Sequence, residues 1–324
     1  MKLAISPHIS PLRQAFAISR GAKTQAKTII VTLERGGFTG RGECVPYPRY
    51  SESVASVTEE IEAVRGAIEA GIDRAALQSL LPAGAARCAV DCALWDLDAK
   101  TQGKPVWKIA GLSAPSPVET ATTVSLDTPA EMGAAARKIK GELLKLKLGS
   151  EDDIARLRAV HEARPDARLI VDGNEGLSPD TFSAFTSQAA TLGVVLIEQP
   201  FPAGKDGALM RAASGIPVCA DESVHTSKDI PHLAKRYDAV NVKLDKAGGL
   251  TEAITMVKAA RDAQMKVMIG CMVAGSLSMA PALLLAGQAD FVDLDGPLWL
   301  SRDIDHGLTI ADGIIQPADT ALWG

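Results

Sequence analysis

The sequence predicts an α/β protein whose main part is a (β/α)8-type TIM barrel, preceded by a smaller α+β region. Six ionisable residues each close a short apolar run at intervals of about 25 residues, the last interval being twice as long, and a strand with its crossover helix takes about that length. These residues are Lys147, Asp172, Glu198, Asp221, Lys243 and Asp293. The chain has 324 residues, of which 47% are hydrophobic, enough for a barrel and a second domain.

The first third of the chain departs from this interval and predicts an antiparallel sheet with helices. Alternating residues over 28–34 and 39–44, with a Gly-Gly turn between them, predict a hairpin. Helical spacing of apolar residues predicts a helix over 51–70, with Ser51 as its N-cap. A second helix over 85–100 is rich in alanine, which favours close packing against a neighbour.

The rest of the chain predicts eight strands, the number that a closed barrel needs. Segments that mix alanine, leucine and charged residues, such as 151–164 and 251–264, predict surface helices between the strands. The expected strands are residues 118–124, 143–147, 169–172, 194–198, 218–221, 239–243, 266–270 and 291–293.

These elements predict two domains. Residues 1–113 form the α+β domain, which ends in a linker rich in proline and serine. Residues 114–299 form the barrel. The tail, residues 300–324, has little helical pattern, and we expect it to pack back on the N-terminal domain.

Composition excludes several classes of protein. The net charge of −5, the lack of a basic run and the small number of tyrosines and tryptophans argue against nucleic-acid binding. No segment has the 18 or so uninterrupted apolar residues of a membrane span, and the N-terminus lacks the apolar stretch of a signal peptide. Five scattered cysteines suit a reducing compartment better than a disulfide framework. We therefore expect a cytoplasmic protein without a membrane partner.

Two smaller features have a simple structural explanation. Cys88 and Cys92 lie four residues apart in a helical pattern, and without further ligands at suitable spacing we expect buried thiols rather than a metal site. Gly248 and Gly249 precede a helix, where either an anion site or an ordinary turn would account for them.

Three carboxylates predict a metal site at one rim of the barrel. Asp172, Glu198 and Asp221 close the third, fourth and fifth barrel strands, so they converge where barrel enzymes carry their active sites. A single acid in such a loop is usually structural, but three in register repel one another unless a cation joins them. An all-oxygen ligand set prefers Mg²⁺ or Mn²⁺ to zinc.

Two lysines predict the chemistry. Lys147 closes the second strand and Lys243 the sixth, so in a ring of eight they face each other across the barrel mouth. With a metal on a substrate carboxylate, one lysine can remove the α-proton and the other can return a proton to the opposite face, inverting the carbon. Lys145, two residues before Lys147, and the metal both favour the neutral amine that a base requires.

Around these residues the sequence resembles the enolase superfamily and its muconate-lactonizing subgroup. The resemblance covers essentially the whole chain. It implies a modified (β/α)7β barrel with an N-terminal capping domain, bound Mg²⁺ and two lysine bases, of which Lys147 serves the (S) face. The matching segments are Lys145–Lys147 for the KxK motif, Val171–Asn174, Ile197–Pro200 and Ala220–Ser223 for the metal-binding motifs, and Asn241–Leu244 for the sixth-strand lysine motif.

Within the subgroup the sequence is most similar to the dipeptide epimerases, in particular those acting on Ala-Glu. Asp293-Leu294-Asp295 resembles the DxD motif with which those enzymes bind the free ammonium of the dipeptide, a sensible match of charges. Arg20 matches the arginine that in such enzymes meets the glutamyl side-chain carboxylate. The resemblance also implies that the substrate pocket is lined by Thr123, Lys145 and Cys271.

We therefore expect a Mg²⁺-dependent isomerase that interconverts L-Ala-D-Glu and L-Ala-L-Glu during murein peptide recycling. Its partner is a small dipeptide, and the sequence is compatible with a homo-oligomer. One alternative keeps the fold but changes the reaction, to other dipeptides or to the o-succinylbenzoate synthase or cycloisomerase type. Elimination and cycloisomerisation substrates lack the ammonium that the DxD motif would bind. The other alternative is a non-catalytic metal-binding relative, which the presence of all five core residues disfavours.

Overall fold

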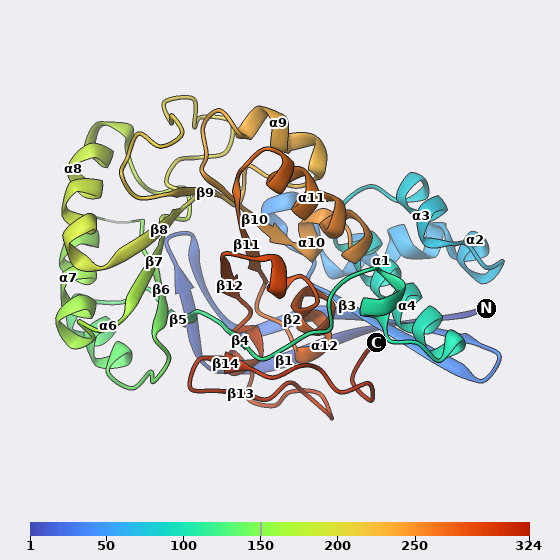
Figure 1. Cartoon of the computed structure of the whole chain (residues 1–324). Helices are drawn as coiled ribbons and strands as arrows, with labels where there is room; N and C mark the ends of the chain where they lie inside the picture. The colour runs from blue at the N-terminus through green and yellow to red at the C-terminus, as the bar shows by residue number, and fades with distance from the viewer. Residues whose placement is uncertain (150) are drawn as a thin grey trace.

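The N-terminal part of the chain is a three-stranded antiparallel sheet in the order β1-β2-β3, drawn in blue in Figure 1. The computed structural model describes residues 1–149 and 151–324. The strands are β1 (Lys2–Ile18), β2 (Gly21–Arg35) and β3 (Phe38–Cys44). The predicted hairpin is confirmed as β2 and β3, but β1 was missed. Most side chains of β1 are exposed, so the strand shows no clear alternation of apolar and polar residues.

The first predicted helix of the N-terminal part differs from the prediction in where it begins and in being divided. The helix expected over 51–70 is divided at Val64, and its N-cap is Ser53, whose side chain accepts a hydrogen bond from the Ser56 amide. Ser51 is not the cap, because it has a φ of 63° at the end of the preceding short helix. The elements are η1 (Pro48–Tyr50), α1 (Val54–Ala63), α2 (Arg65–Glu69), α3 (Arg74–Leu80), α4 (Ala85–Gln102) and α5 (Val106–Ile109).

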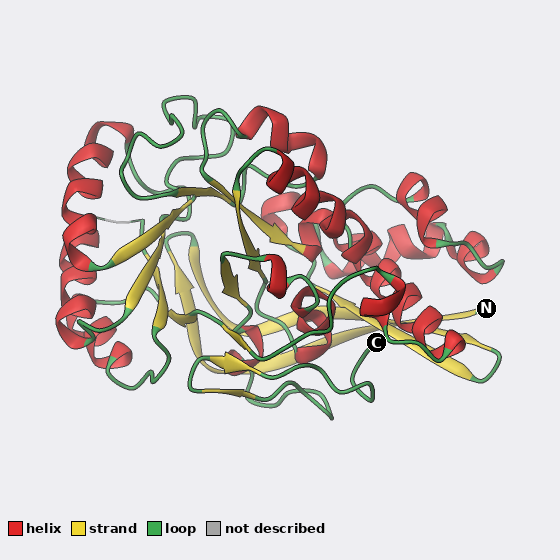
Figure 2. Ribbon diagram, in the orientation of Figure 1, coloured by secondary structure: helices red, strands yellow, loops and turns green. Residues whose placement is uncertain are grey.

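The predicted barrel is confirmed as an eight-stranded parallel sheet in the order β12-β11-β10-β9-β8-β7-β6-β5. The two ends of this sheet meet where the Ala121 amide donates a 2.8 Å hydrogen bond to the Val292 carbonyl. Figure 2 shows the strands surrounded by helices, with the antiparallel sheet alongside. The strands are β5 (Thr122–Val124), β6 (Leu143–Lys147), β7 (Arg168–Asp172), β8 (Val194–Glu198), β9 (Val218–Ala220), β10 (Ala239–Lys243), β11 (Lys266–Gly270) and β12 (Phe291–Asp293).

One predicted strand is in fact two. The segment 118–124 divides into β4 (Val118–Glu119) and β5, because β4 leaves the barrel to pair with the C-terminal tail. The tail forms a hairpin of β13 (Ile310–Ala311) and β14 (Ile314–Ile315), and β14 pairs with β4 in antiparallel fashion.

Helices follow most barrel strands, as predicted, but residues 199–217 connect β8 to β9 without a helix. No helix in the described part of the chain is long and apolar enough to cross a membrane. The remaining helices are α6 (Pro129–Ala136), α7 (Asp153–Ala163), α8 (Pro179–Ala189), η2 (Ala190–Leu192), η3 (Ser227–Asp229), α9 (Ile230–Leu233), α10 (Leu244–Ala247), α11 (Leu250–Asp262), α12 (Ser276–Leu283), η4 (Ala286–Gln288) and η5 (Gly296–Trp299).

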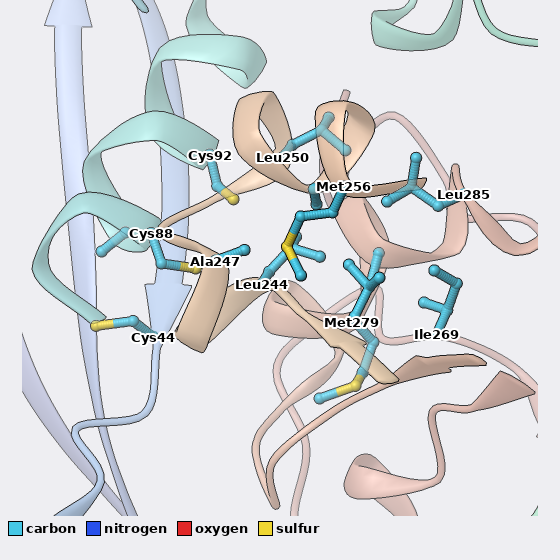
Figure 3. Packing of buried hydrophobic residues seen from close by; sticks show 14 of the residues in the cluster. Cys44, Cys88, Cys92, Leu244, Ala247, Leu250, Met256, Ile269, Met279 and Leu285 are labelled. Carbon is cyan, nitrogen blue, oxygen red and sulfur yellow. The ribbon is translucent and has the colours of Figure 1, made fainter. Parts of the chain in front are cut away.

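The largest hydrophobic core continues from the N-terminal sheet into the barrel helices. Figure 3 shows Cys88 and Cys92 of α4 facing Ala247 and Leu250 across this core, and both thiols are buried, as expected. The tail reaches the same core, since Trp323 is buried and its indole nitrogen donates to the Cys92 carbonyl at 3.2 Å. The N-terminal sheet is thus packed firmly against the barrel.

Candidate active site

The candidate active site is a cavity at the C-terminal ends of the barrel strands, partly covered by the tip of the β1–β2 hairpin. Parallel strands present their carboxyl ends on one rim, which is why residues far apart in the sequence meet here. All predicted site residues line this cavity except Asp172 and Glu198, which lie against it in ion pairs with Lys145. The predicted lining residues are Arg20, Thr123, Lys145, Lys147, Asp221, Lys243, Cys271, Asp293 and Asp295.

The two candidate bases lie on opposite sides of the barrel. Lys147 ends β6 and Lys243 ends β10, and three strands separate them whichever way the ring is followed. Each ammonium contacts a carboxylate: Lys147 Nζ lies 2.7 Å from Asp172 Oδ2, and Lys243 Nζ lies 2.7 Å from Asp221 Oδ2. A small molecule in the cavity would have an amine on each face.

Lys145 joins three carboxylates beneath the cavity. Its Nζ lies 2.6 Å from Glu198 Oε2, 2.8 Å from Asp293 Oδ2 and 3.4 Å from Asp172 Oδ2. Burial alone would lower the pKa of Lys145, but these carboxylates raise it well above its usual value. The charge of Lys145 is therefore balanced by carboxylates, an environment that its position beside Lys147 in the sequence did not indicate.

The same balance sets the ionisation of Asp221 and Lys243. Burial alone would raise the pKa of Asp221, but Lys243, Lys246 and Lys145 hold it well below its usual value. Burial would lower the pKa of Lys243, but Asp221 and Glu198 raise it. The site therefore holds a charged carboxylate beside each candidate base, and the carboxylates govern how readily Lys243 gives up its proton.

The three predicted metal ligands form a buried set that cationic groups already bridge. Lys145 contacts both Asp172 and Glu198, while Lys243 contacts Asp221 and lies 4.0 Å from Glu198. Among residues 1–149 and 151–324, no three His, Cys, Asp or Glu side chains surround a single point. The donors are nevertheless all carboxylate oxygens at the ends of adjacent strands, a set that fits a hard divalent cation such as Mg²⁺.

Neighbouring polar groups orient these carboxylates. The Asn241 side chain donates to Glu198 Oε1 at 2.7 Å, and the backbone amide of Asn174 donates to Asp172 Oδ1 at 2.9 Å. Lys246 donates to Asp221 Oδ1 at 2.5 Å and is fully buried. Sequence reasoning missed Lys246, although its position three residues after Lys243, in the short helix α10, was a usable signal.

A second polar network supports the turn that carries Asp221. Gln199 accepts hydrogen bonds from the Asp221 and Ser223 amides through Oε1, at 2.8 and 3.1 Å. Its Nε2 donates to Tyr237 at 3.0 Å, and Tyr237 in turn donates to the buried Asp206 at 2.6 Å. The helix-free connection between β8 and β9 thus supplies Asp206 to fix this turn, which no sequence pattern predicted.

Asp293 and Asp295 lie together at the end of β12. Asp293 Oδ2 contacts Lys145, while its Oδ1 is buried and accepts no hydrogen bond from the described residues. Asp295 Oδ2 accepts from the Thr123 amide at 2.7 Å and from the Trp299 indole at 3.3 Å. Burial and the charge of Asp293 raise the pKa of Asp295 to about 6. Two close carboxylates with one unused oxygen are suited to a positively charged ligand group.

Arg20, at the turn between β1 and β2, contacts the barrel as well as the cavity. It donates to Glu222 Oε1 and to the Asn174 carbonyl, both at 2.7 Å. It also contacts Glu175 at 3.2 Å, a carboxylate that Arg49 of η1 binds through two hydrogen bonds. These contacts tie the hairpin tip to the barrel loops.

Gly248 and Gly249 do not form an anion site, because side chains of α4 occupy the space beside them. Arg87 donates to the Ala247 carbonyl at 2.7 Å and to the Gly248 carbonyl at 3.2 Å. Asp91 accepts from the Thr251 amide at 3.0 Å at the start of α11. A Cβ at Gly248 would lie 2.3 Å from Arg87 Nε, which explains the glycine.

The chain resembles known proteins over nearly its whole length. Residues 2–111 match the family described as Mandelate racemase / muconate lactonizing enzyme, N-terminal domain, and residues 127–321 match Enolase C-terminal domain-like. The L-Ala-D/L-Glu epimerase of Escherichia coli (strain K12) is 44% identical over 306 residues, which are 94% of this chain and 95% of that protein. An N-acetyl-D-glutamate racemase of Pseudoalteromonas sp is 44% identical over 299 residues, 91% of this chain and 95% of that protein.

A solved structure is also similar. It is an enolase family member from Agrobacterium tumefaciens, described as homologous to dipeptide epimerases and as containing sodium and L-Ala-L-Glu. It superposes with a TM-score of 0.97 at 48% identity, and the match covers 99% of each chain.

Proposed function

Because the chain belongs to the mandelate racemase and muconate lactonizing enzyme family of the enolase superfamily, and is an isomerase among the dipeptide epimerases, we propose that it inverts the glutamyl α-carbon of L-Ala-D/L-Glu. The observation that carries this proposal is the position of Lys147 and Lys243 on opposite sides of one cavity that also contains the Asp293 and Asp295 pair. The lysines suit proton transfer on both faces of a carbon, and the aspartates suit the free ammonium of a dipeptide.

In this proposal Lys147 removes the α-proton from the (S) face and Lys243 protonates the (R) face, and the roles reverse in the other direction. Asp172, Glu198 and Asp221 would hold Mg²⁺. The ion would polarise the substrate carboxylate and offset the negative charge that develops when the α-proton leaves. Lys145 balances the remaining carboxylate charge, and Asn241 and Lys246 keep Glu198 and Asp221 in their orientations.

L-Ala-D-Glu is a component of murein peptides, so we place this reaction in their recycling. Inversion to L-Ala-L-Glu converts the D-residue into one that ordinary peptidases and amino acid metabolism accept. The five free cysteines fit the reducing cytoplasm in which such recycling would take place.

A second candidate is racemisation of an N-acylated glutamate, which the Pseudoalteromonas relative favours because its identity to this chain is the same as that of the dipeptide epimerase. Such a substrate carries the same side-chain and α-carboxylates but no ammonium. The unused Asp293 oxygen beside Asp295 favours the dipeptide.

Proton exchange in D₂O tests the proposal. With Mg²⁺ and L-Ala-L-Glu, proton NMR should show loss of the glutamyl α-hydrogen and growth of the L-Ala-D-Glu diastereomer. Lys243→Ala should still exchange the α-hydrogen of L-Ala-L-Glu without inverting it, whereas Lys147→Ala should exchange only L-Ala-D-Glu. EDTA should stop all exchange, and added Mg²⁺ should restore it.

The exposed Lys27→Ala variant serves as the matched control and should behave as wild type. Exchange of N-acetyl-glutamate but not of either dipeptide would replace the first candidate by the second. Absence of exchange with every substrate, in protein shown to bind Mg²⁺, would refute both.

A further inference from the structure

The hairpin that partly covers the cavity places an aromatic ring beside one of the two candidate bases. Phe16 of β1 lines the cavity, and the centroid of its ring lies 5.8 Å from Lys147 Nζ. The same Nζ contacts Asp172 at 2.7 Å. A cation within about 6 Å of a ring centroid is attracted by the negative face of the ring. The surroundings of Lys147 therefore include a group that the reaction outlined above does not use.

The other candidate base has different surroundings. Lys243 Nζ contacts Asp221 at 2.7 Å and lies 4.0 Å from Glu198. It lies over no aromatic ring of residues 1–149 and 151–324. Tyr50 also lines the cavity, but its ring packs against that of His225, with 4.7 Å between the centroids. The bases that would serve the two faces of the substrate thus differ in one respect, the ring of Phe16.

Contacts with the barrel fix the position of Phe16. The amide of the next residue, Ala17, donates to Ser125 Oγ at 2.7 Å, and the Ala17 carbonyl accepts from the Leu126 amide at 3.0 Å. The Phe16 ring meets the buried Trp299 ring edge to face, with 4.7 Å between the centroids and 90° between the planes. Both the backbone and a side-chain contact therefore hold the ring beside Lys147.

An irregularity in β1 allows these contacts. The register between β1 and β2 shifts between Pro11 and Phe16, so that residues 12–15 lie opposite the single residue Thr24. Such a bulge bends a strand and changes the direction of its side chains. Phe16 then pairs with Lys23, whose Nζ lies 5.4 Å from the centroid of the same ring. The strand thus leaves the regular sheet pairing just before the residue that it places in the cavity.

We propose that Phe16 is a positioning residue that holds and covers the Lys147 amine, and so supports proton transfer by Lys147 but not by Lys243. This inference rests on the proposed function. A lysine that removes a proton becomes positively charged, and the face of the ring stabilises the charge that develops on Lys147 Nζ in the transition state. The ring also excludes water from the amine, which strengthens this attraction.

Variants with a single base test the proposal in D₂O with Mg²⁺ present. In Lys243→Ala, exchange of the α-hydrogen of L-Ala-L-Glu depends on Lys147, and in Lys147→Ala, exchange of L-Ala-D-Glu depends on Lys243. Adding Phe16→Leu, which keeps an apolar side chain but removes the ring, should slow the first exchange about five- to thirtyfold and the second by less than about twofold. Phe16→Tyr should retain the first rate, because tyrosine keeps the ring.

Phe38→Leu, at an exposed aromatic residue of β3, is the matched control and should change neither exchange. Equal slowing of both exchanges by Phe16→Leu would show that the ring only shapes the cavity or supports Trp299, and would overturn the proposal. Unchanged exchange of L-Ala-L-Glu would overturn it as well.

Chemical labelling distinguishes failure of this inference from failure of the proposed function. Acetic anhydride acetylates accessible lysine amines, and mass spectrometry after digestion gives the rate at each residue. Phe16→Leu should acetylate Lys147 several times faster than wild type does, with Lys243 in the same digest unchanged. If wild type exchanges no α-hydrogen, the proposed reaction is wrong. Faster labelling of Lys147 then still supports the covering role of Phe16, and an unchanged rate overturns it.

Discussion

Asp295 holds a carboxylate in the pocket without an ion-pair partner among the described residues. The Thr123 amide and the Trp299 indole orient one of its oxygens, and Asp293 lies beside it. This arrangement keeps the carboxylate in place while leaving its charge available to a ligand. The ammonium of a dipeptide is the group in the proposed substrate that matches it.

We predict that Asp295→Asn lowers kcat/KM for L-Ala-L-Glu about ten- to hundredfold, because asparagine keeps an oxygen acceptor but removes the charge. Activity on N-acetyl-glutamate, which has no ammonium, should not fall. Steady-state kinetics with both substrates measures the difference, and Asp305→Asn, an exposed aspartate, is the control. Equal losses on both substrates would show that Asp295 only supports Thr123 and Trp299.

Helix α4 connects the N-terminal sheet to the rim of the barrel that carries the candidate bases. Its Arg87 binds the carbonyls that end α10, and its Asp91 binds the first turn of α11. Helix ends leave unpaired carbonyl and amide groups that need such partners. Since α10 follows directly after Lys243, α4 positions one of the two candidate bases from another part of the chain.

We predict that Arg87→Met lowers the free energy of unfolding by about 2–4 kcal/mol, because it leaves buried carbonyls without donors. If the proposed roles of the lysines hold, exchange of L-Ala-D-Glu in D₂O, which would use Lys243, should fall more than exchange of L-Ala-L-Glu, which would use Lys147. Urea unfolding and NMR measure the two effects, and the exposed Arg137→Met is the control. An equal fall for both diastereomers would contradict a selective effect of α4 on Lys243.

Across the whole molecule, buried carboxylates lie where the N-terminal sheet meets the barrel. Asp245 of α10 accepts a 2.7 Å hydrogen bond from the Val45 amide, and burial together with nearby Glu52 and Glu43 raises its pKa to about 7. Glu43 of β3 accepts from the Ser278 amide at 3.1 Å in α12, and burial raises its pKa to about 7 as well. Both groups hold a proton in the folded protein at a pH where the unfolded chain would release it.

Stability should therefore fall as the pH rises from about 4 to about 7, because the unfolded chain binds fewer protons than the folded one in this range. Above about pH 7 the folded and the unfolded protein have both lost the proton, so the loss of stability from this cause is complete. We predict that Asp245→Asn, which keeps an acceptor for Val45, loses less stability than wild type between about pH 5 and about pH 8. Urea unfolding at about pH 5 and about pH 8 measures the change in stability of each protein, with Asp305→Asn as the control. Parallel pH profiles of wild type and Asp245→Asn would refute the role of Asp245.

The barrel could be predicted, and the candidate acids and bases could be placed at its rim, because their signal lies along the chain. Short apolar runs ending in Lys147, Asp172, Glu198 or Lys243 mark buried parallel strands, and the closure of the barrel brings their ends to one rim. The strand β1 had no such signal, since its side chains are mostly exposed. The division of 118–124 also had none, because it depends on pairing with a tail almost 200 residues away.

The strand order and the candidate acids and bases thus follow from local pattern and spacing. Both depend on residues that lie close together in the sequence. The choice of ion-pair partners does not: Lys145 binds Asp293, Arg20 binds Glu222, and Lys23 pairs with no carboxylate of the residues that the structure describes. Only the tertiary structure decided these contacts, because the strength of a pairing between charges depends on their separation in space and on burial, and neither is written in the distance along the chain.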